Sequence, residues 1–309
     1  MASDISVSAR NIHKSFFTGK TELKALQSIS FEVNRGELFG LIGPDGAGKT
    51  TLFRILTTLM LANKGEATVD GFDVVRDYQQ IRKRVGYMPG RFSLYQDLTV
   101  EENLSFFATL FNTTLEENYD MVKSIYQQIE PFKKRRAGAL SGGMKQKLAL
   151  SCALIHRPSV LFLDEPTTGV DAVSRKEFWE LLRELQAREI TIIVSTPYMD
   201  EASLCDRVAL MQDSKIMGIN TPLGITKSFK KPLWSVRCDD MYQLMLDLRA
   251  KEEVETCYPF GQNHHVVLKD RNVDLEKTRM VVGSTGAKNL VVQPIGATIE
   301  DCFMELMRQ

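Results

Sequence analysis

The sequence predicts an α/β protein built on a parallel β-sheet, followed by a smaller α+β module. Three short, mostly apolar runs, at residues 38–42, 160–163 and 190–194, are too short for helices and are typical of buried strands. Segments with helical spacing separate them, and buried strands that alternate with helices indicate a parallel sheet. The length of 309 residues corresponds to about two domains.

Composition narrows the class of protein. Apolar residues make up 43% and charged residues 25%, as in an ordinary folded protein, which argues against disorder. The 39 lysines and arginines balance the 39 aspartates and glutamates, so no large basic field exists to hold nucleic acid. The five cysteines never show C-x-x-C spacing, which favours a reducing compartment over a disulfide framework or zinc site. We also expect no signal peptide, because charges interrupt the first residues, and no membrane span, because no run of 18 apolar residues occurs.

The chain begins with segments that alternate like strands, around Ile5 and Val7 and again from Leu26 to Val33. The apolar strand at 38–42 then leads into a glycine-rich segment. Apolar residues at helical spacing follow, at Leu52, Ile55, Leu56 and Leu59. This stretch is therefore expected to form a strand, a tight loop and a helix.

The glycine-rich segment matches the pattern G-x-x-x-x-G-K-[ST]. Gly46 and Gly48 allow backbone conformations in which successive N–H groups point at a phosphate, and the following helix presents its positive end to the same anion. Lys49 would then reach the terminal phosphates, and the Thr50 hydroxyl would bind Mg²⁺. The alternative is a chance glycine turn beside an unrelated lysine. The expected phosphate-binding residues are Gly43, Pro44, Asp45, Gly46, Ala47, Gly48, Lys49, Thr50 and Thr51.

Two carboxylates follow the apolar run at 160–163. They would lie at the carboxyl end of a buried strand, where open α/β sheets bind ligands. Asp164 would hold Mg²⁺ through water, and Glu165 would orient or deprotonate the attacking water. Taken alone, the pair could be solvated acids at the end of a strand. Together with a phosphate loop, it predicts phosphoryl chemistry with Lys49 and Glu165 as the catalytic residues.

The segment from about Leu98 to His156 is expected to be mostly helical, with Thr99 and Glu102 as a capping box. Near its end, Ser141-Gly142-Gly143 stands where a helix would begin and offers a second anion-binding helix terminus. By itself this triplet is more often a cap than a site. A further amphipathic helix is expected from Ser174 to Glu189.

At this point the chain resembles the ATP-binding subunits of ABC transporters. Four segments resemble that family's motifs in order and spacing: its phosphate loop GPDGAGKT, its signature sequence LSGGMKQK, its carboxylate strand LFLDEP and its D-loop TTGVDAVSR. The resemblance extends from about residue 5 to 222. It implies a P-loop NTPase fold with a RecA-like parallel sheet core, an N-terminal antiparallel β-subdomain and a helical subdomain at about 91–157, together forming an ATP-binding domain at 1–224.

The resemblance also implies a mechanism and partners. ATP, with Mg²⁺, would lie between the phosphate loop of one cassette and the signature residues Ser141, Gly142 and Gly143 of a second, with Asp171 beside them. An aromatic residue would stack on adenine, for which Phe16 is the better candidate and Phe17 the alternative. Phe16 could equally be a plain core aromatic. The partners would be a second cassette and a polytopic membrane subunit that holds the protein at the cytoplasmic face of the inner membrane, with no nucleic acid.

Two positions depart from the family's pattern. The family's glutamine that contacts Mg²⁺ is replaced by Gly90, and its switch histidine after Ser195-Thr196 is replaced by Pro197. Proline offers neither a side-chain donor nor a backbone N–H. Losing one donor to the reacting phosphate typically costs about 10²–10³ in rate. One interpretation is that the chain's own site binds ATP well but hydrolyses it slowly, while its signature helix completes a competent site on a different partner in an asymmetric heterodimer. The other is a working homodimer that uses other groups, for instance Arg91 or Glu165 alone.

The last segment, 232–309, is predicted to be a small α+β accessory domain after a linker at Lys230-Lys231-Pro232. Its final residues resemble the end of ATPase subunits of drug-exporter-like transporters, which suggests export. Residues Phe92, Leu94 and Tyr95 are candidates for contact with the membrane subunit, or for packing within the helical subdomain. Two other function classes stay open: a non-hydrolysing subunit clamped by nucleotide, and a soluble ABC-type ATPase.

Overall fold

A computed structural model describes residues 4–19 and 21–308. The chain divides into two compact units, the first ending at Pro222 and the second beginning at Leu223. Each unit has its own hydrophobic core. The two units are described separately below.

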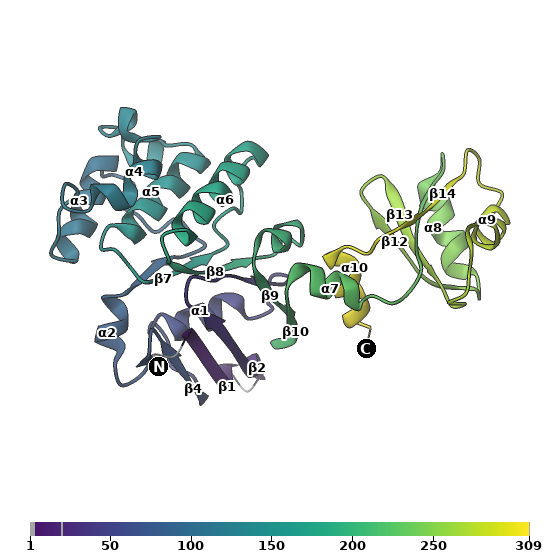
Figure 1. Ribbon diagram of the computed structural model, residues 1–309, viewed down its shortest axis with the longest axis horizontal. Helices are drawn as coiled ribbons and strands as arrows, with labels where there is room; N and C mark the ends of the chain where they lie inside the picture. The colour runs from purple at the N-terminus through teal and green to yellow at the C-terminus, as the bar shows by residue number, and fades with distance from the viewer. Residues whose placement is uncertain (1–3, 20, 309) are drawn as a thin grey trace. The chain divides into compact units, whose positions relative to one another are not determined.

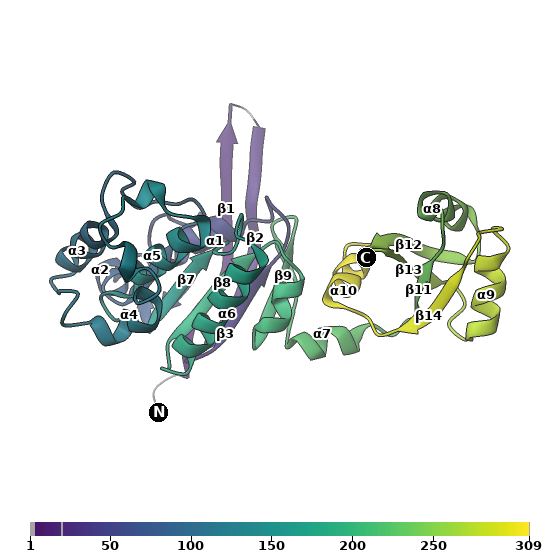
Figure 2. The same ribbon diagram turned by 90° about the horizontal axis from the view of Figure 1, so that it is seen from above.

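The first unit begins with an antiparallel sheet that the alternating segments predicted. Its strands, in the spatial order β2-β1-β4-β5, are β1 (Ile5–Thr18), β2 (Thr21–Asn34), β4 (Lys64–Val69) and β5 (Phe72–Asp73). The β1–β2 hairpin is long and projects from the rest of this unit (Figure 2). Phe16 and Leu23 pair across its two strands close to the turn, on the projecting part.

The second sheet of this unit forms the centre of the cassette, in the order β10-β9-β3-β8-β7-β6. Every pair is parallel except the terminal hairpin of β9 and β10, so the predicted parallel core is confirmed. All residues of β3, β7 and β8 are buried, which explains why these strands read as continuous apolar runs. The strands are β3 (Leu38–Ile42), β6 (Val85–Met88), β7 (Val160–Asp164), β8 (Thr191–Thr196), β9 (Arg207–Gln212) and β10 (Lys215–Asn220).

Helices pack around this sheet, and three of them, α3, α4 and α5, form a group of their own (Figure 1). The predicted capping box at Thr99 and Glu102 is present at the start of α3, and Ser141 caps α5. The helices of the unit are α1 (Lys49–Leu56), α2 (Tyr78–Arg82), α3 (Val100–Leu110), α4 (Tyr119–Tyr126), α5 (Gly142–Leu154) and α6 (Ala172–Gln186), with 3₁₀ turns η1 (Glu130–Phe132), η2 (Ala137–Ala139) and η3 (Asp200–Leu204).

The common direction of the parallel strands determines at which edge of the sheet a ligand can bind. The strands β3, β6, β7 and β8 run in the same direction, so their carboxyl ends meet at one edge of the sheet. The phosphate loop, the Gly90 segment, the two carboxylates and the Pro197 segment follow these four strands directly. Open α/β sheets bind ligands at this edge.

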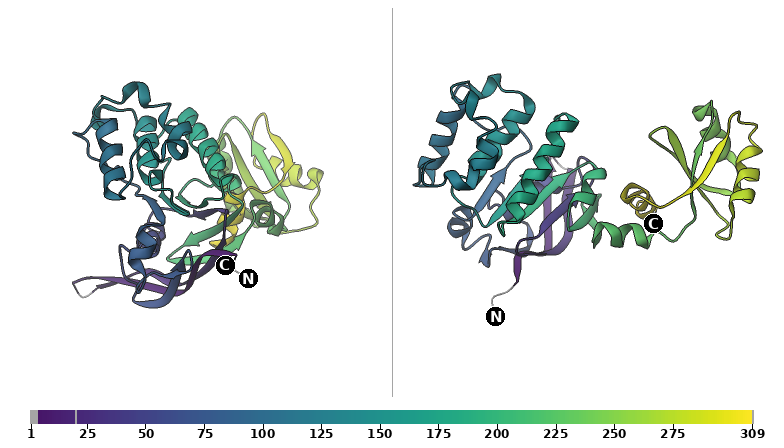
Figure 3. Two further views of the ribbon diagram at one scale, coloured as in Figure 1. Left: turned by 60° about the vertical axis from the view of Figure 1, so that its left-hand side comes forward. Right: turned by 45° about the horizontal axis from the view of Figure 1, so that its top comes forward.

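The second unit contains a βαββαβ sequence of elements that forms one antiparallel sheet in the order β12-β13-β11-β14. Helices α8 and α9 cover one face of the sheet, and α10 lies on the opposite face (Figures 1 and 3). The elements are α7 (Pro222–Ser228), β11 (Leu233–Arg237), α8 (Met241–Ala250), β12 (Val254–Phe260), β13 (Asn263–Leu268), α9 (Leu275–Gly283), β14 (Val291–Ile295) and α10 (Ile299–Leu306). Within residues 4–19 and 21–308, no helix is long and apolar enough to cross a membrane.

Candidate functional site

The phosphate loop joins β3 to α1 and is held close to neighbouring backbone. A Cβ on Gly43 would lie 2.2 Å from the Met211 carbonyl oxygen, and one on Gly48 would lie 2.4 Å from the Ala25 carbonyl oxygen. Gly48 also has φ +104°, a conformation that side chains rarely adopt. Glycine is therefore required at both positions for the loop to keep this path.

Lys49, the first residue of α1, is buried and turned back over the loop. Its Nζ donates hydrogen bonds to the carbonyl oxygens of Gly43 (2.7 Å) and Pro44 (3.0 Å). The same Nζ lies 3.3 Å from Oε1 of Glu165. The structure thus brings together the two residues to which the sequence assigned catalytic roles, although they are far apart along the chain.

Ser195, which sequence reasoning did not single out as functional, binds the Asp164 carboxylate and the backbone of Glu165. Its Oγ donates to Oδ1 of Asp164 (2.6 Å) and accepts from the backbone N–H of Glu165 (3.1 Å). Residues 164 and 195 are partners in the parallel register of β7 and β8. Glu165 itself has φ +50°, a strained backbone conformation of the kind that clusters at active sites.

A cavity of about 550 Å³ lies beside the phosphate loop. The side chain of Phe16 lines it, so the adenine-stacking candidate and the phosphate loop face one space. Phe17 is 73% exposed and is not among the lining residues. The predicted site residues that line this cavity are Phe16, Gly46, Gly48, Lys49, Thr50, Thr51 and Glu165.

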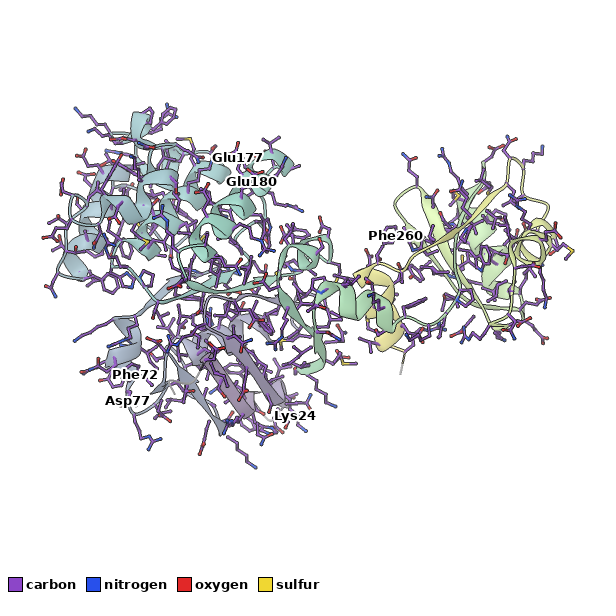
Figure 4. The ribbon with its side chains drawn as sticks, in the orientation of Figure 1. Lys24, Phe72, Asp77, Glu177, Glu180 and Phe260 are labelled. Carbon is purple, nitrogen blue, oxygen red and sulfur yellow. The ribbon has the colours of Figure 1, made fainter. Side chains whose placement is uncertain are left out.

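The far wall of this cavity was not predicted. Lys24 and Gln27 of β2 contribute to it, together with the turn Asp213-Ser214 between β9 and β10. Figure 4 labels Lys24 on β2, the outer strand of the N-terminal sheet. Both turn residues have positive φ, and Ser214 Oγ donates to the Lys24 carbonyl oxygen (2.7 Å). A short polar turn is a common sequence feature, so nothing in the sequence pointed to this contact.

Within one chain, the signature residues Ser141, Gly142 and Gly143 do not line the cavity beside the phosphate loop. Ser141 is exposed, and its Oγ accepts from the backbone N–H of Met144 (3.3 Å) at the start of α5. Asp171 acts as the N-cap of α6 by accepting from the N–H groups of Val173 (3.1 Å) and Ser174 (3.0 Å). These hydrogen bonds, mainly that from Ser174, hold the pKa of the Asp171 carboxyl below its usual value.

A second cavity of about 180 Å³ lies next to Gly90. Lys145 and Gln146 of α5 line it, and so does Glu165, which therefore borders both cavities. A Cβ on Gly90 would lie 3.1 Å from the Asp164 carbonyl oxygen. The position of the family's glutamine is thus close to the carboxylates, but this chain supplies no side chain there.

The segment around Pro197 is fixed by a buried carboxylate. Glu201 is 1% exposed and accepts hydrogen bonds from the hydroxyls of Thr196 (2.6 Å) and Thr167 (2.7 Å). The N–H of Tyr198 donates to Oγ1 of Thr196 (3.1 Å). The backbone on both sides of Pro197 is therefore held in place, while position 197 presents no hydrogen-bond donor.

Few protein groups at this site could bind a metal ion. No cluster of three or more histidine, cysteine, aspartate or glutamate side chains that could hold a metal occurs in the described part of the chain. Thr50 lines the cavity beside the phosphate loop, and Asp164 is buried at the carboxyl end of β7. Such a donor set suits Mg²⁺, which usually binds one or two protein groups together with phosphate oxygens and water.

Residues 26–168 match the family model described as ABC transporter. A relative named a probable multidrug ABC transporter ATP-binding protein, YbhF of Escherichia coli K12, is 43% identical over 206 residues. That match covers 66% of this chain but only 36% of the relative, so the chain spans about a third of YbhF.

A second relative matches along its whole length. The Nod factor export ATP-binding protein I of Rhizobium sp. strain N33 is 37% identical over 310 residues, which covers 98% of this chain and 97% of the relative. Among solved structures, cbiO1 of Clostridium perfringens, described as part of an ABC transporter complex, superposes with a TM-score of 0.64 at 26% identity. The superposition covers 73% of this chain and 92% of cbiO1.

Proposed function

Because the chain belongs to the ATP-binding proteins of ABC transporters, we propose that it couples ATP binding and hydrolysis to export by a separate polytopic membrane subunit. ATP-binding subunits of this family work as dimers with membrane permeases. The observation that supports the proposal most strongly is a single cavity bordered by Phe16, the phosphate loop and Glu165. Names of relatives that refer to multidrug transport and Nod factor export favour export over import.

Each residue has a distinct task in this proposal. The adenine ring stacks on Phe16, a contact that needs no base-specific hydrogen bond. The backbone N–H groups between Gly43 and Thr51 surround the phosphates, and Lys49 neutralises the terminal ones. Mg²⁺ would be held by Thr50 and, through water, by Asp164, and it would neutralise charge on the phosphate oxygens.

Glu165 is proposed to orient or deprotonate the attacking water. Its pairing with Lys49 places the carboxylate where the terminal phosphate would lie. Binding of ATP would draw Lys49 to the phosphates and leave the Glu165 carboxylate available to a water molecule. Ser195 keeps Asp164 and Glu165 in place during this exchange.

A second cassette is proposed to complete the site. Ser141 and the N-terminus of α5 are exposed, and they lie outside the nucleotide cavity of their own chain. Head-to-tail packing of two cassettes would bring this helix terminus to the phosphates bound by the partner. Localisation at the cytoplasmic face of the membrane would follow from attachment to the membrane subunit.

We further propose that the chain's own site hydrolyses ATP slowly. Gly90 and Pro197 each remove a polar side chain from the neighbourhood of Asp164 and Glu165. The loss of one donor to the reacting phosphate typically reduces the rate by about 10²–10³. An intact signature helix would still complete a competent site on a different cassette in a heterodimer.

Two measurements on the purified full-length protein test these statements. Binding of a fluorescent ATP analogue should be saturable and Mg²⁺-dependent, and Glu165→Gln should bind at least as tightly as the parent, because it removes the carboxylate that competes with phosphate for Lys49. Phosphate release under the same conditions should be slow, and vigorous turnover without any partner would exclude the weak-site proposal. Co-purification of a polytopic membrane protein from detergent-solubilised membranes tests the transport role.

An alternative function, a subunit that binds ATP without hydrolysing it, is supported by the same two positions, Gly90 and Pro197. If nucleotide only clamps a dimer, ATP should promote dimer formation and no phosphate should be released over many hours. A measurable rate that Glu165→Gln abolishes would instead assign hydrolysis to this chain. A soluble ABC-type ATPase is distinguished by the absence of any membrane partner in the co-purification.

A further inference from the structure

The second unit contains a cavity of about 310 Å³ between the edge strand β12 and helix α10. Its volume falls at the lower end of the range of small-molecule sites. Apolar side chains of Phe229, Val267 and Met304 form part of its lining, and charged residues together with Thr256, Cys257 and Tyr258 form the rest. The cavity belongs to a unit to which neither the phosphate loop nor the signature helix contributes.

The carboxylates at this cavity already have partners. Glu255 pairs with Lys231 (2.5 Å) and with Arg271 (2.7 Å), and Glu305 pairs with the same Lys231. Burial raises the pKa of Glu255, but the hydrogen bonds from Lys231 and Arg271 outweigh it and leave that pKa below its usual value. Glu255 is therefore negative and balanced by neighbouring cations, and Glu305 shares the Lys231 partner.

Asp301 is satisfied in the same way by a buried network. His265 Nδ1 lies 2.7 Å from its Oδ1, and the hydroxyl of Tyr258 donates to the same oxygen. The backbone N–H and the hydroxyl of Thr298 both donate to Oδ2 (2.7 Å). Phe260, labelled in Figure 4, stacks on the His265 ring with centroids 4.1 Å apart. This network fixes α10 to the sheet and leaves Asp301 with no free acceptor for a cationic ligand.

Two lining arginines, in contrast, have no carboxylate partner. Nε of Arg249 donates to the Cys257 carbonyl oxygen (2.8 Å), and Nη2 of Arg308 donates to the Glu255 carbonyl oxygen (3.2 Å). Within residues 4–19 and 21–308, no ion pair involves either guanidinium. Each guanidinium carries five N–H donors, so most of them are available to a ligand.

The two guanidinium groups are placed to act together. Residues 255 and 257 lie two positions apart on one strand, a separation of about 6.6 Å along the strand axis. The hydrogen bonds to these carbonyls hold both arginines along the free edge of β12. Lys231 and Arg271 pair with lining carboxylates but do not line the cavity themselves. When these two partners are counted with Arg249 and Arg308, four permanent cations stand against the carboxylates of Glu255, Asp301 and Glu305, a sum of one excess positive charge.

We propose that this cavity binds a small organic monoanion, with a carboxylate held between Arg249 and Arg308 and an apolar body against Phe229, Val267 and Met304. Guanidinium groups match the planar carboxylate with paired N–H donors, which a neutral ligand of the same shape cannot use. The site goes beyond the proposed transport function. A ligand there would connect β12 to α10 and stabilise the second unit.

Calorimetric titration of the full-length protein with 4-phenylbutyrate tests the proposal. Saturating Mg–ADP occupies the phosphate loop, and the buffer contains low salt and no other carboxylate or phosphate. The expected result is one binding site per chain. 4-Phenylbutanol, a neutral probe with the same ring and chain, should bind at least about tenfold more weakly.

The double variant Arg249→Gln/Arg308→Gln should weaken 4-phenylbutyrate binding at least about tenfold, because glutamine keeps an amide donor for the strand carbonyls but has no charge. Arg279→Gln is the matched control, since Arg279 is an exposed arginine on α9 outside the cavity lining. Unchanged near-ultraviolet circular dichroism from the buried Trp234, together with a parent-like urea unfolding transition, shows in both variants that the second unit folds. Absence of binding at 10 mM, equal binding of 4-phenylbutanol, or an equal effect of Arg279→Gln would each overturn the proposal.

Discussion

The Nζ of Lys49 lies 3.3 Å from the Oε1 of Glu165, and these side chains are only 2% and 21% exposed. The phosphate-loop lysine and the carboxylate proposed to act on water are therefore direct partners. Ion pairs of this kind are strengthened by exclusion of water. Any anion that binds Lys49 competes with Glu165, so phosphate binding and release of the carboxylate are linked.

Lys49→Ala is expected to weaken ATP binding about 10- to 100-fold, because charge-assisted hydrogen bonds to the phosphates contribute roughly 1.5–3 kcal/mol each. Titration with a fluorescent ATP analogue measures the change. Lys64→Ala, which removes an exposed lysine from β4, is the control and should leave binding unchanged. Parent-like ATP affinity in Lys49→Ala would remove the basis for the nucleotide site.

Gly90→Gln is expected to raise the rate of ATP hydrolysis about tenfold or more. The new Cβ lies 3.1 Å from the Asp164 carbonyl oxygen, so a shift of a few tenths of an ångström accommodates it. The amide can then enter the cavity of about 180 Å³ that borders Glu165. Steady-state phosphate release measures the rate.

Gly90→Ala is the matched control for that variant, because it adds the Cβ without the amide. If alanine and glutamine change the rate equally, the effect comes from the backbone and not from a polar group near the phosphate.

Pro197→His is expected to raise the single-turnover rate of hydrolysis, because it supplies the donor that proline lacks; one such donor is worth about 10²–10³ in rate. Glu201 keeps the surrounding backbone in place through Thr196 and Thr167. Pro197→Ala restores a backbone N–H without a side-chain donor and serves as the control. A histidine variant no faster than the alanine variant would contradict the assignment of a lost donor at this position.

Gly143→Ala is expected to destabilise the first unit by about 1–3 kcal/mol, since overpacking of a tight contact has this size. The added Cβ would lie 2.7 Å from Oγ and 2.9 Å from Cβ of Ser174, where α5 packs against α6. Urea unfolding measures the loss. Ser174→Gly removes both atoms, so the double variant should recover stability relative to Gly143→Ala, and failure to recover would place the strain elsewhere.

The stability of the first unit is expected to fall as the pH drops from about 6.5 to about 4. Burial lowers the pKa of His156 to about 4, and its ring stacks on Phe111 with centroids 3.8 Å apart. The unfolded chain, with a histidine pKa of about 6.5, then binds the proton more readily than the folded chain does. The loss, on the order of 3 kcal/mol, is absent above pH 6.5 and complete near pH 4.

Urea unfolding at several pH values measures this loss. His156→Gln keeps an amide donor for the Val85 carbonyl oxygen, which the ring Nε2 contacts at 3.2 Å, and cannot titrate. The variant should therefore show a flatter profile between pH 6.5 and 4. An unchanged slope would assign the pH dependence to other groups.

Local pattern predicted much of this structure. The apolar runs predicted β3, β7 and β8, because strands buried on both faces are made mostly of apolar residues. The capping box at Thr99 and the helix start at Ser141 were also predicted, since caps depend on neighbouring residues. Strands β4, β5, β9 and β10 were not predicted, although β4 pairs with β5 and β9 with β10 across short turns.

The contacts of several side chains could be identified only in the folded structure. Of the three apolar residues after Arg91, Leu94 is buried, whereas Tyr95 is half exposed and packs against Phe106. Lys231, in the segment where a linker was expected, is bound to Glu255 and Glu305 within the second unit. The sequence contains no local signal for either outcome, because both depend on contacts between segments distant in the chain.

The sequence by itself determined that the chain carries a phosphate loop, a carboxylate strand and two departures from the family's pattern, because each is a short pattern of consecutive residues. Only the tertiary structure decided that Lys49 pairs with Glu165, that Ser195 binds the Asp164 carboxylate and the Glu165 backbone N–H, and that Arg249 and Arg308 share a cavity. The physical reason is that strand register and helix packing set the distances between side chains. These distances arise from the burial of apolar surface across the whole unit, which no short segment encodes.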